Sequence, residues 1–264
     1  MEPVSEPQHV PLQTSDGVRL AATLWQSEER LIGCVVGHGF TGSSRNPDVR
    51  RICSALAARG MTVLAPDFRG HGRSGGLGTA GADEIHDVAA AVAWLRAAGY
   101  DFVAVLGWSM GGSAVLRYAG LGGDADAVVS VSAPGTWFER GTRAMRVVHW
   151  MLLSRTGRVA TRLWRGTRVS SAGWATIPEA PAEVVGAIAP RPLLIVHGGR
   201  DHYFPAHHVA ALEAGAPDAD VWRETEMGHA EVATTPELLD RIVLWVRHAY
   251  ERTRAVCDDE RRDG

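Results

Sequence analysis

The sequence lacks the features of several specialised classes of protein. Its three cysteines, Cys34, Cys53 and Cys257, are odd in number and widely spaced. This argues against a disulfide framework and favours a reducing compartment. No apolar run approaches the length needed to span a bilayer, and the acidic N-terminus lacks the apolar core of a secretory signal. We therefore predict a soluble, cytoplasmic protein.

A strong charge of either sign is also missing. The formal net charge is -3 at pH 7, with 22% charged and 45% hydrophobic residues, as is typical of a globular protein. We therefore expect no nucleic-acid partner. The length of 264 residues fits one large α/β domain, or one domain carrying a small insertion.

Apolar runs that are typical of buried strands alternate with amphipathic segments along the chain. The predicted strands are 18–25, 31–36, 61–65, 102–106, 127–131, 192–197 and one near 221–222. The predicted helices are 46–59, 83–98, 110–119, one from about 206, and 236–252. This order predicts an α/β fold with a doubly wound, mostly parallel sheet covered by helices on both faces.

The alternation fails between the strand at 127–131 and the strand at 192–197. We interpret residues 135–185 as a small helical cap inserted in a core formed by 1–134 and 186–264. This insertion contains four of the nine tryptophans. It also contains eight arginines between Arg140 and Arg168, where the only nearby acid is Glu139.

A G-x-S-x-G pattern stands between the strand at 102–106 and the helix at 110–119, with Ser109 at its centre. A sharp strand-to-helix turn holds such a serine in a strained conformation, which leaves room only for glycine two residues before and after it. Gly107 and Gly111 occupy those positions. We therefore predict that Ser109 is a catalytic nucleophile.

A serine hydroxyl needs a base, and the base needs a carboxylate that orients it. Asp201 follows the strand at 192–197, and His229 follows the strand near 221–222. Both positions lie at the carboxyl ends of parallel strands, where open α/β sheets bind their ligands. The sequence therefore predicts a triad of Ser109, Asp201 and His229, in that chain order.

The tetrahedral intermediate of acyl transfer carries an oxyanion, which needs hydrogen-bond donors placed in advance. We assign this role to the backbone N–H groups of Phe40 and Met110. Substrate contacts are expected from four further residues, His38, Trp108, Trp137 and Phe138. The aromatic residues of the insertion either line an apolar acyl pocket or simply pack the insertion onto the core.

Five stretches together resemble the α/β-hydrolase superfamily, in particular the serine-hydrolase branch of acylglycerol lipases and serine aminopeptidase-like enzymes. They are His38–Phe40 with the following Gly42-Ser43, then 67–74, 107–112, 197–201 and Gly228-His229. The resemblance implies a hydrolase without a cofactor, in which the insertion at 135–185 corresponds to the family's cap. The motifs are specific for the superfamily and say little about the substrate.

We therefore expect a serine hydrolase that cleaves a small-molecule carboxylic ester with an apolar acyl group. Hydrolysis of amides, peptides or thioesters on the same fold remains open, as does a catalytically silent binding protein. Glu226 and Glu231 are alternative orienting acids if Asp201 is badly placed. His202, His207 and His208 cluster in sequence, but their spacing matches no common zinc pattern, so we predict no metal.

Arg140, Arg143 and Arg146 recur every three residues and so share one helical face. Such a stripe is either a solvated face or a surface for an anionic substrate or lipid headgroups. A transient membrane contact through the arginine-rich cap is therefore one expectation. The sequence leaves the oligomeric state open.

Overall fold

The computed structural model describes residues 6–263, and the side chains of residues 6–255. Eight strands form one sheet in the order β1-β2-β4-β3-β5-β6-β7-β8, in which β2 pairs antiparallel with β1 and β4, and all other pairs are parallel. The strands are β1 (Gln8–Gln13), β2 (Arg19–Trp25), β3 (Ile32–Gly37), β4 (Met61–Pro66), β5 (Phe102–Trp108), β6 (Ala127–Val131), β7 (Leu193–Gly198) and β8 (Asp220–Glu224). The predicted mostly parallel sheet is confirmed.

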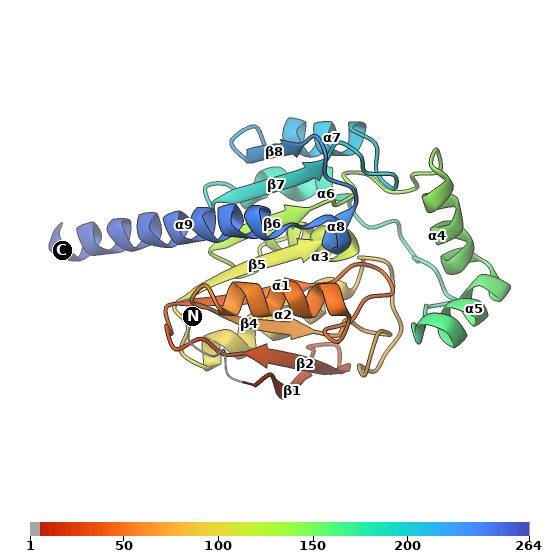
Figure 1. The fold of residues 1–264 in the computed structure, drawn as a ribbon, viewed down its shortest axis with the longest axis horizontal. Helices are drawn as coiled ribbons and strands as arrows, with labels where there is room; N and C mark the ends of the chain where they lie inside the picture. Colours follow the sequence, from red (N-terminus) through yellow and green to blue (C-terminus); the bar gives the residue numbers. More distant parts are fainter. Residues whose placement is uncertain (1–5, 264) are drawn as a thin grey trace.

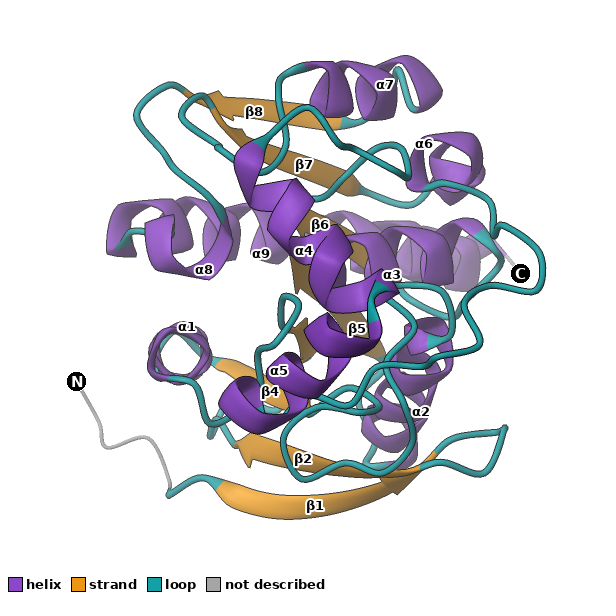
Figure 2. Ribbon diagram, turned by 90° about the vertical axis from the view of Figure 1, so that its right-hand side faces the viewer, coloured by secondary structure: helices purple, strands orange, loops and turns teal. Residues whose placement is uncertain are grey.

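The helices cover the sheet on both faces (Figures 1 and 2). They are α1 (Pro47–Ala57), α2 (Glu84–Ala97), α3 (Met110–Gly120), α4 (Arg143–Leu153), α5 (Arg155–Arg165), α6 (Pro181–Val184), α7 (His207–Gly215), α8 (Ala230–Ala233) and α9 (Pro236–Asp263), with a 3-10 turn at Val185–Ile188. None of the helices in the described residues is long and apolar enough to cross a membrane.

Two hydrophobic cores lie on opposite faces of the sheet. Val103 and Val105 of β5 join the core beneath α2, α3 and α7, whereas Ala104 and Leu106 join the core beneath α1 and α9. Successive side chains of a strand point to opposite faces, so a strand covered on both sides must be apolar throughout. This explains why β5 has no charged residue and why every one of its residues is buried.

Strand β1 is an edge strand that the sequence analysis did not predict. Only Val10 and Leu12 are buried, and the strand contains Pro11, which a central strand would not accommodate. The C-terminal helix also differs from the prediction, because α9 continues to Asp263 instead of ending near Arg252. Of the cysteines, Cys34 and Cys53 are buried and free, and the side chain of Cys257 lies outside the described residues.

Helices α4 and α5 lie beyond the carboxyl ends of the parallel strands (Figure 1) and cross in front of them in Figure 2. The chain then returns to the core at Arg168, whose backbone N–H donates to the carbonyl of Gly70 over 2.7 Å and whose carbonyl accepts from Gly78 over 2.8 Å. This short pairing fixes the end of the α4–α5 segment against the glycine-rich loop that follows β4. We retain residues 135–185 as a proposed cap.

Candidate active site

Ser109 occupies the sharp turn between β5 and α3. Its backbone has φ 52° and ψ −116°, a strained conformation for a residue with a side chain. A Cβ on Gly107 would lie 2.2 Å from the carbonyl oxygen of Gly111, and one on Gly111 would lie 2.2 Å from that of Gly37. The two glycines are therefore required by backbone contacts, and the turn presents the Ser109 hydroxyl at the N-terminus of α3.

The structure brings Ser109, His229 and Asp201 into one hydrogen-bonded series. The Oγ of Ser109 lies 3.0 Å from Nε2 of His229, and Nδ1 of His229 lies 2.7 Å from Oδ2 of Asp201. With the Nδ1 proton donated to Asp201, Nε2 is the acceptor for the serine proton. This is the arrangement that activates a serine nucleophile.

Asp201 is held by more than the imidazole. Its second oxygen, Oδ1, accepts from the backbone N–H groups of Tyr203 at 2.8 Å and Phe204 at 3.0 Å, and its side chain is fully buried. Burial raises the pKa of Asp201, but the hydrogen bonds from His229 and the two backbone groups outweigh burial and hold this pKa below its ordinary value. Asp201 is thus a fixed carboxylate with each oxygen occupied.

Two aromatic rings position the imidazole of His229. The ring of Tyr203 lies 4.3 Å from it between centroids, and the ring of Phe204 lies 5.5 Å away with an edge-on geometry. The sequence analysis predicted neither residue. A sequence does not indicate that a ring two or three positions after Asp201 packs against a histidine far away in the chain. The side chain of His229 is 11% exposed, so its contact with water is small.

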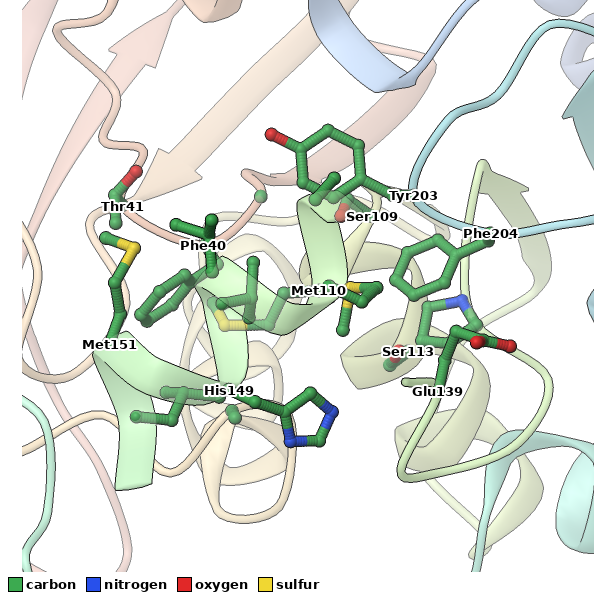
Figure 3. Close-up of a pocket in the computed structure, with 18 of the residues that line it drawn as sticks. Phe40, Thr41, Ser109, Met110, Ser113, Glu139, His149, Met151, Tyr203 and Phe204 are labelled. Carbon is green, nitrogen blue, oxygen red and sulfur yellow. The ribbon is translucent and has the colours of Figure 1, made fainter. Parts of the chain in front are cut away.

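The backbone N–H groups of Phe40 and Met110 have no hydrogen-bond acceptor in the described part of the protein. Met110 is the first residue of α3, and both residues line the cavity that contains Ser109 (Figure 3). Unsatisfied N–H groups at a helix start favour negative charge. This applies to Met110, whereas Phe40 lies in the turn after β3. The assignment of both N–H groups as oxyanion donors stays a prediction.

Glu231 fixes the loop that carries Phe40. Its Oε1 accepts from the N–H of Gly39 over 2.6 Å, and burial raises the pKa of this carboxyl. Glu231 therefore does not orient His229, which is the alternative role we considered for it. Glu226, the other alternative acid, forms an ion pair with Arg200 at the surface.

A cavity of about 1070 Å³ opens in front of Ser109 and His229. This volume is at the upper end of the range of about 300–1,000 Å³ for small-molecule sites. Its walls are mainly apolar and come from the loop after β3, from α3 and from α4. In Figure 3, Met151 of α4 lies at the left of the view near Phe40 and Thr41, and Ser113 and Glu139 lie at the right. Burial lowers the pKa of His149.

Of the four residues predicted to contact substrate, Trp137 and Phe138 line the cavity, whereas His38 and Trp108 do not. His38 is buried, with Nδ1 2.8 Å from the carbonyl of Gly39 and Nε2 accepting from the N–H of Phe68 over 3.0 Å. Its ring thus joins the loop after β3 to the loop after β4. The prediction of a substrate contact is corrected for both residues.

The indole of Trp108 lies in the core, because the residue before Ser109 points away from the cavity when the serine points toward it. Its Nε1 donates to Oγ1 of Thr234 over 2.9 Å, and the residue has no exposed surface. This contact ties the nucleophile turn to the end of α8, close to His229.

A cluster of Glu139, His207 and His208 has the composition of a metal site. Oε2 of Glu139 lies 3.0 Å from Nε2 of His207 and 3.2 Å from Nε2 of His208. Nδ1 of His208 accepts from the N–H of Gly135 over 3.2 Å, so Nε2 of His208 carries the proton and donates to Glu139. That nitrogen has no lone pair for a metal. The cluster is instead a hydrogen-bonded clamp between α7 and the start of the 135–185 segment.

Comparisons with known proteins agree with this architecture. The family model described as "alpha/beta hydrolase fold" matches residues 35–161. No curated protein matches the chain in sequence.

Solved structures superpose over nearly the whole chain. The esterase Pf2001 of Pyrococcus furiosus is 24% identical, with a TM-score of 0.73 and coverage of 92% of this chain and 91% of that one. The α/β hydrolase GrgF from Penicillium sp. sh18 is 16% identical, with a TM-score of 0.75 and coverage of 93% and 99%. XC6422 from Xanthomonas campestris, described as an α/β serine hydrolase without lid, is 18% identical, with a TM-score of 0.61 and coverage of 95% and 97%. With its fold, its matching family model and its strand-to-helix serine turn, this chain is a member of the α/β-hydrolase superfamily.

Proposed function

We propose that the protein is a serine hydrolase that cleaves carboxylic esters with apolar acyl groups through an acyl-enzyme. The observation that carries the proposal is the hydrogen-bonded series from Ser109 through His229 to Asp201, with distances of 3.0 and 2.7 Å. Ser109, at one end of the series, lines a large, mainly apolar cavity. Esterases with the same fold, such as Pf2001, support the choice of an ester bond.

The first half of the reaction forms the acyl-enzyme. Nε2 of His229 removes the proton from Ser109 as Oγ attacks the ester carbonyl. The negative charge that develops on the carbonyl oxygen is stabilised by the N–H groups of Phe40 and Met110. The protonated imidazole, held by Asp201, then gives its proton to the departing alcohol, and the C–O bond of the ester breaks.

The second half returns the enzyme to its starting state. A water molecule in the cavity loses a proton to Nε2 of His229 and attacks the acyl carbon. The same two N–H groups stabilise the second oxyanion. The bond between the acyl carbon and Ser109 breaks, Oγ recovers the proton from His229, and the carboxylic acid leaves.

The direct test is turnover of a short activated ester by the wild type and by Ser109→Ala. We expect the variant to lose nearly all activity, because the Ser109 hydroxyl is the group hydrogen-bonded to Nε2 of His229. Ser54→Ala, at an exposed position on α1, is the matched control and should keep wild-type turnover. Equal rates in the wild type and Ser109→Ala would disprove the proposal.

Two substrate series test separately which bond is cleaved and which acyl group is preferred. Matched ester, thioester and amide substrates with one acyl group identify the bond, and we expect the ester to react fastest. A series of esters with lengthening acyl chains tests the apolar cavity. Burial of each methylene contributes about 0.8 kcal/mol, so kcat/KM should rise up to about fourfold per methylene until the cavity is filled.

A protein that binds a small molecule without turnover would have the same cavity. Covalent labelling of Ser109 by a fluorophosphonate separates these cases, since it requires an activated serine but no suitable substrate. We expect labelling of the wild type and none of Ser109→Ala. A folded wild type that resists the reagent would favour the binding protein.

A further inference from the structure

Helix α4 has a side on which several residues are exposed among the described residues. Arg143, Arg146, Val147, Trp150 and Leu153 recur at three- and four-residue steps and so share one side of the helix. Val147 is 55% exposed, Trp150 42% and Leu153 60%. Contiguous exposed apolar residues mark sites of interaction with a protein, a membrane or a ligand.

Helix α5 directly follows α4 in the chain and exposes residues of the same two kinds. Arg155, Val159, Arg162 and Leu163 share one side of the helix, and Trp164 follows at its end. Val159 is 58% exposed, Leu163 75% and Trp164 80%. We call the combined exposed residues of the two helices the arginine–apolar surface: Arg143, Arg146, Val147, Trp150, Leu153, Arg155, Val159, Arg162, Leu163 and Trp164.

The arginines of this surface are not neutralised by the protein. None of the four forms an ion pair within the described residues. Residues 140–168 contain eight arginines and no acid, although the whole chain has a net charge of -3. Positive charge is therefore concentrated on one side of the molecule, together with exposed apolar side chains.

We propose that the arginine–apolar surface docks onto a lipid bilayer that contains anionic phospholipids. Guanidinium groups bind phosphate in a bidentate manner, and anionic lipids attract clustered basic residues. Tryptophan and leucine insert at the boundary between headgroups and acyl chains. Arginine and large apolar residues side by side on α4 and α5 match the mixed charged and apolar composition of this boundary.

A second copy of the chain is the other candidate for covering this surface. Symmetric pairing would place the unpaired arginines of both copies against each other, since a two-fold interface joins the same patch on each subunit. Like charges that face each other across an interface oppose association. An anionic bilayer has the opposite charge, so the observations favour the membrane.

The arginine–apolar surface is continuous with the cavity. Val147 and Leu153 are exposed and also line the cavity in front of Ser109. Docking would therefore bring the rim of the cavity to the bilayer surface. This docking does not depend on the proposed ester hydrolysis, because the exposed residues and their charge carry it alone.

The experiment is cosedimentation of the full chain with vesicles. Pure phosphatidylcholine is compared with phosphatidylcholine that contains about a third phosphatidylglycerol, at low and high salt. Arg155→Gln/Arg162→Gln removes charge, and Leu163→Ser/Trp164→Ser removes apolar contacts. Arg45→Gln/Arg50→Gln and Leu121→Ser/Leu244→Ser are matched controls at exposed positions elsewhere.

We expect binding to the anionic vesicles that salt weakens, and little binding to pure phosphatidylcholine. The arginine pair should lower the partition coefficient about 25-fold, at roughly fivefold per charge. The apolar pair should also lower it, while both controls bind like the wild type. Turnover of a water-soluble ester should stay unchanged in all four variants, which separates docking from catalysis.

Three results would overturn the proposal. The first is equal binding to both kinds of vesicle, and the second is equal loss of binding in the controls and the surface variants. The third is a dimer, detected by light scattering, that Leu163→Ser/Trp164→Ser dissociates. That result would assign the surface to a second copy of the chain.

Discussion

Replacing Asp201 by asparagine tests the proposed mechanism at its most buried point. Oδ1 of Asp201 accepts from the N–H groups of Tyr203 and Phe204, and Oδ2 faces Nδ1 of His229 at 2.7 Å. In Asp201→Asn, the two backbone donors hold the amide oxygen in the place of Oδ1. The amide NH2 group must then face His229.

The consequence for His229 follows from its tautomers. With a donor opposite Nδ1, the imidazole carries its proton on Nε2, where it faces Ser109 and cannot accept the serine proton. We expect kcat/KM for an activated ester to fall about 10⁴-fold, which corresponds to about 5 kcal/mol of transition-state stabilisation. The thermal midpoint should change little, because the shape of the side chain is kept.

The assay is ester turnover, with Glu226→Gln as the matched control. Glu226 precedes His229 by three residues but forms an exposed ion pair with Arg200, so this variant should keep wild-type turnover. An Asp201→Asn variant that retains more than a tenth of the wild-type rate would refute the reasoning. A comparable loss in Glu226→Gln would show that the wrong carboxylate was assigned.

Three further predictions concern the loop and turn around the nucleophile. Gly111→Ala should cost about 1–3 kcal/mol in urea unfolding and most of the turnover, because its Cβ would lie 2.2 Å from the carbonyl oxygen of Gly37; wild-type turnover would contradict this. Burial lowers the pKa of His38 to about 3. In the folded state His38 is therefore protonated only at a lower pH than in the unfolded chain, where its pKa is about 6.5. Stability should therefore fall as the pH drops from about 6.5 to 3, by up to about 5 kcal/mol, and unfolding curves for His38→Gln should show a shallower pH slope than the wild type. Glu231→Ala should lower kcat about tenfold by freeing the N–H of Gly39, whereas Glu231→Gln keeps an acceptor and most of the rate; equal losses would exclude this positioning role.

Much of the fold was determined locally by the sequence. The apolar run of β5 had to be buried on both faces, and its alternation with amphipathic helices implied a parallel sheet. The two glycines around Ser109 predicted the turn, and the structure explains them by backbone contacts of 2.2 Å. These features depend on neighbouring residues and on the period of a strand or helix, so the sequence alone carries them.

Other features depended on contacts between distant segments. The short and half-exposed strand β1 gave a weak signal, because an edge strand buries only alternate residues. His38 and Trp108 stood beside motif residues in sequence, yet their side chains point into the core. Neighbours along a strand face opposite sides, and only the packed structure determines which side is the site.

The candidate site shows the same division. The sequence provided Ser109, Asp201 and His229 and their order, because each follows a strand whose end lies at one edge of the sheet. The tertiary structure alone determined how they are held, through the ring of Tyr203 against His229 and the contact of Glu231 with Gly39. Such contacts join residues far apart in the chain and leave no periodic trace in the sequence, so they exist only once the sheet and its loops are assembled.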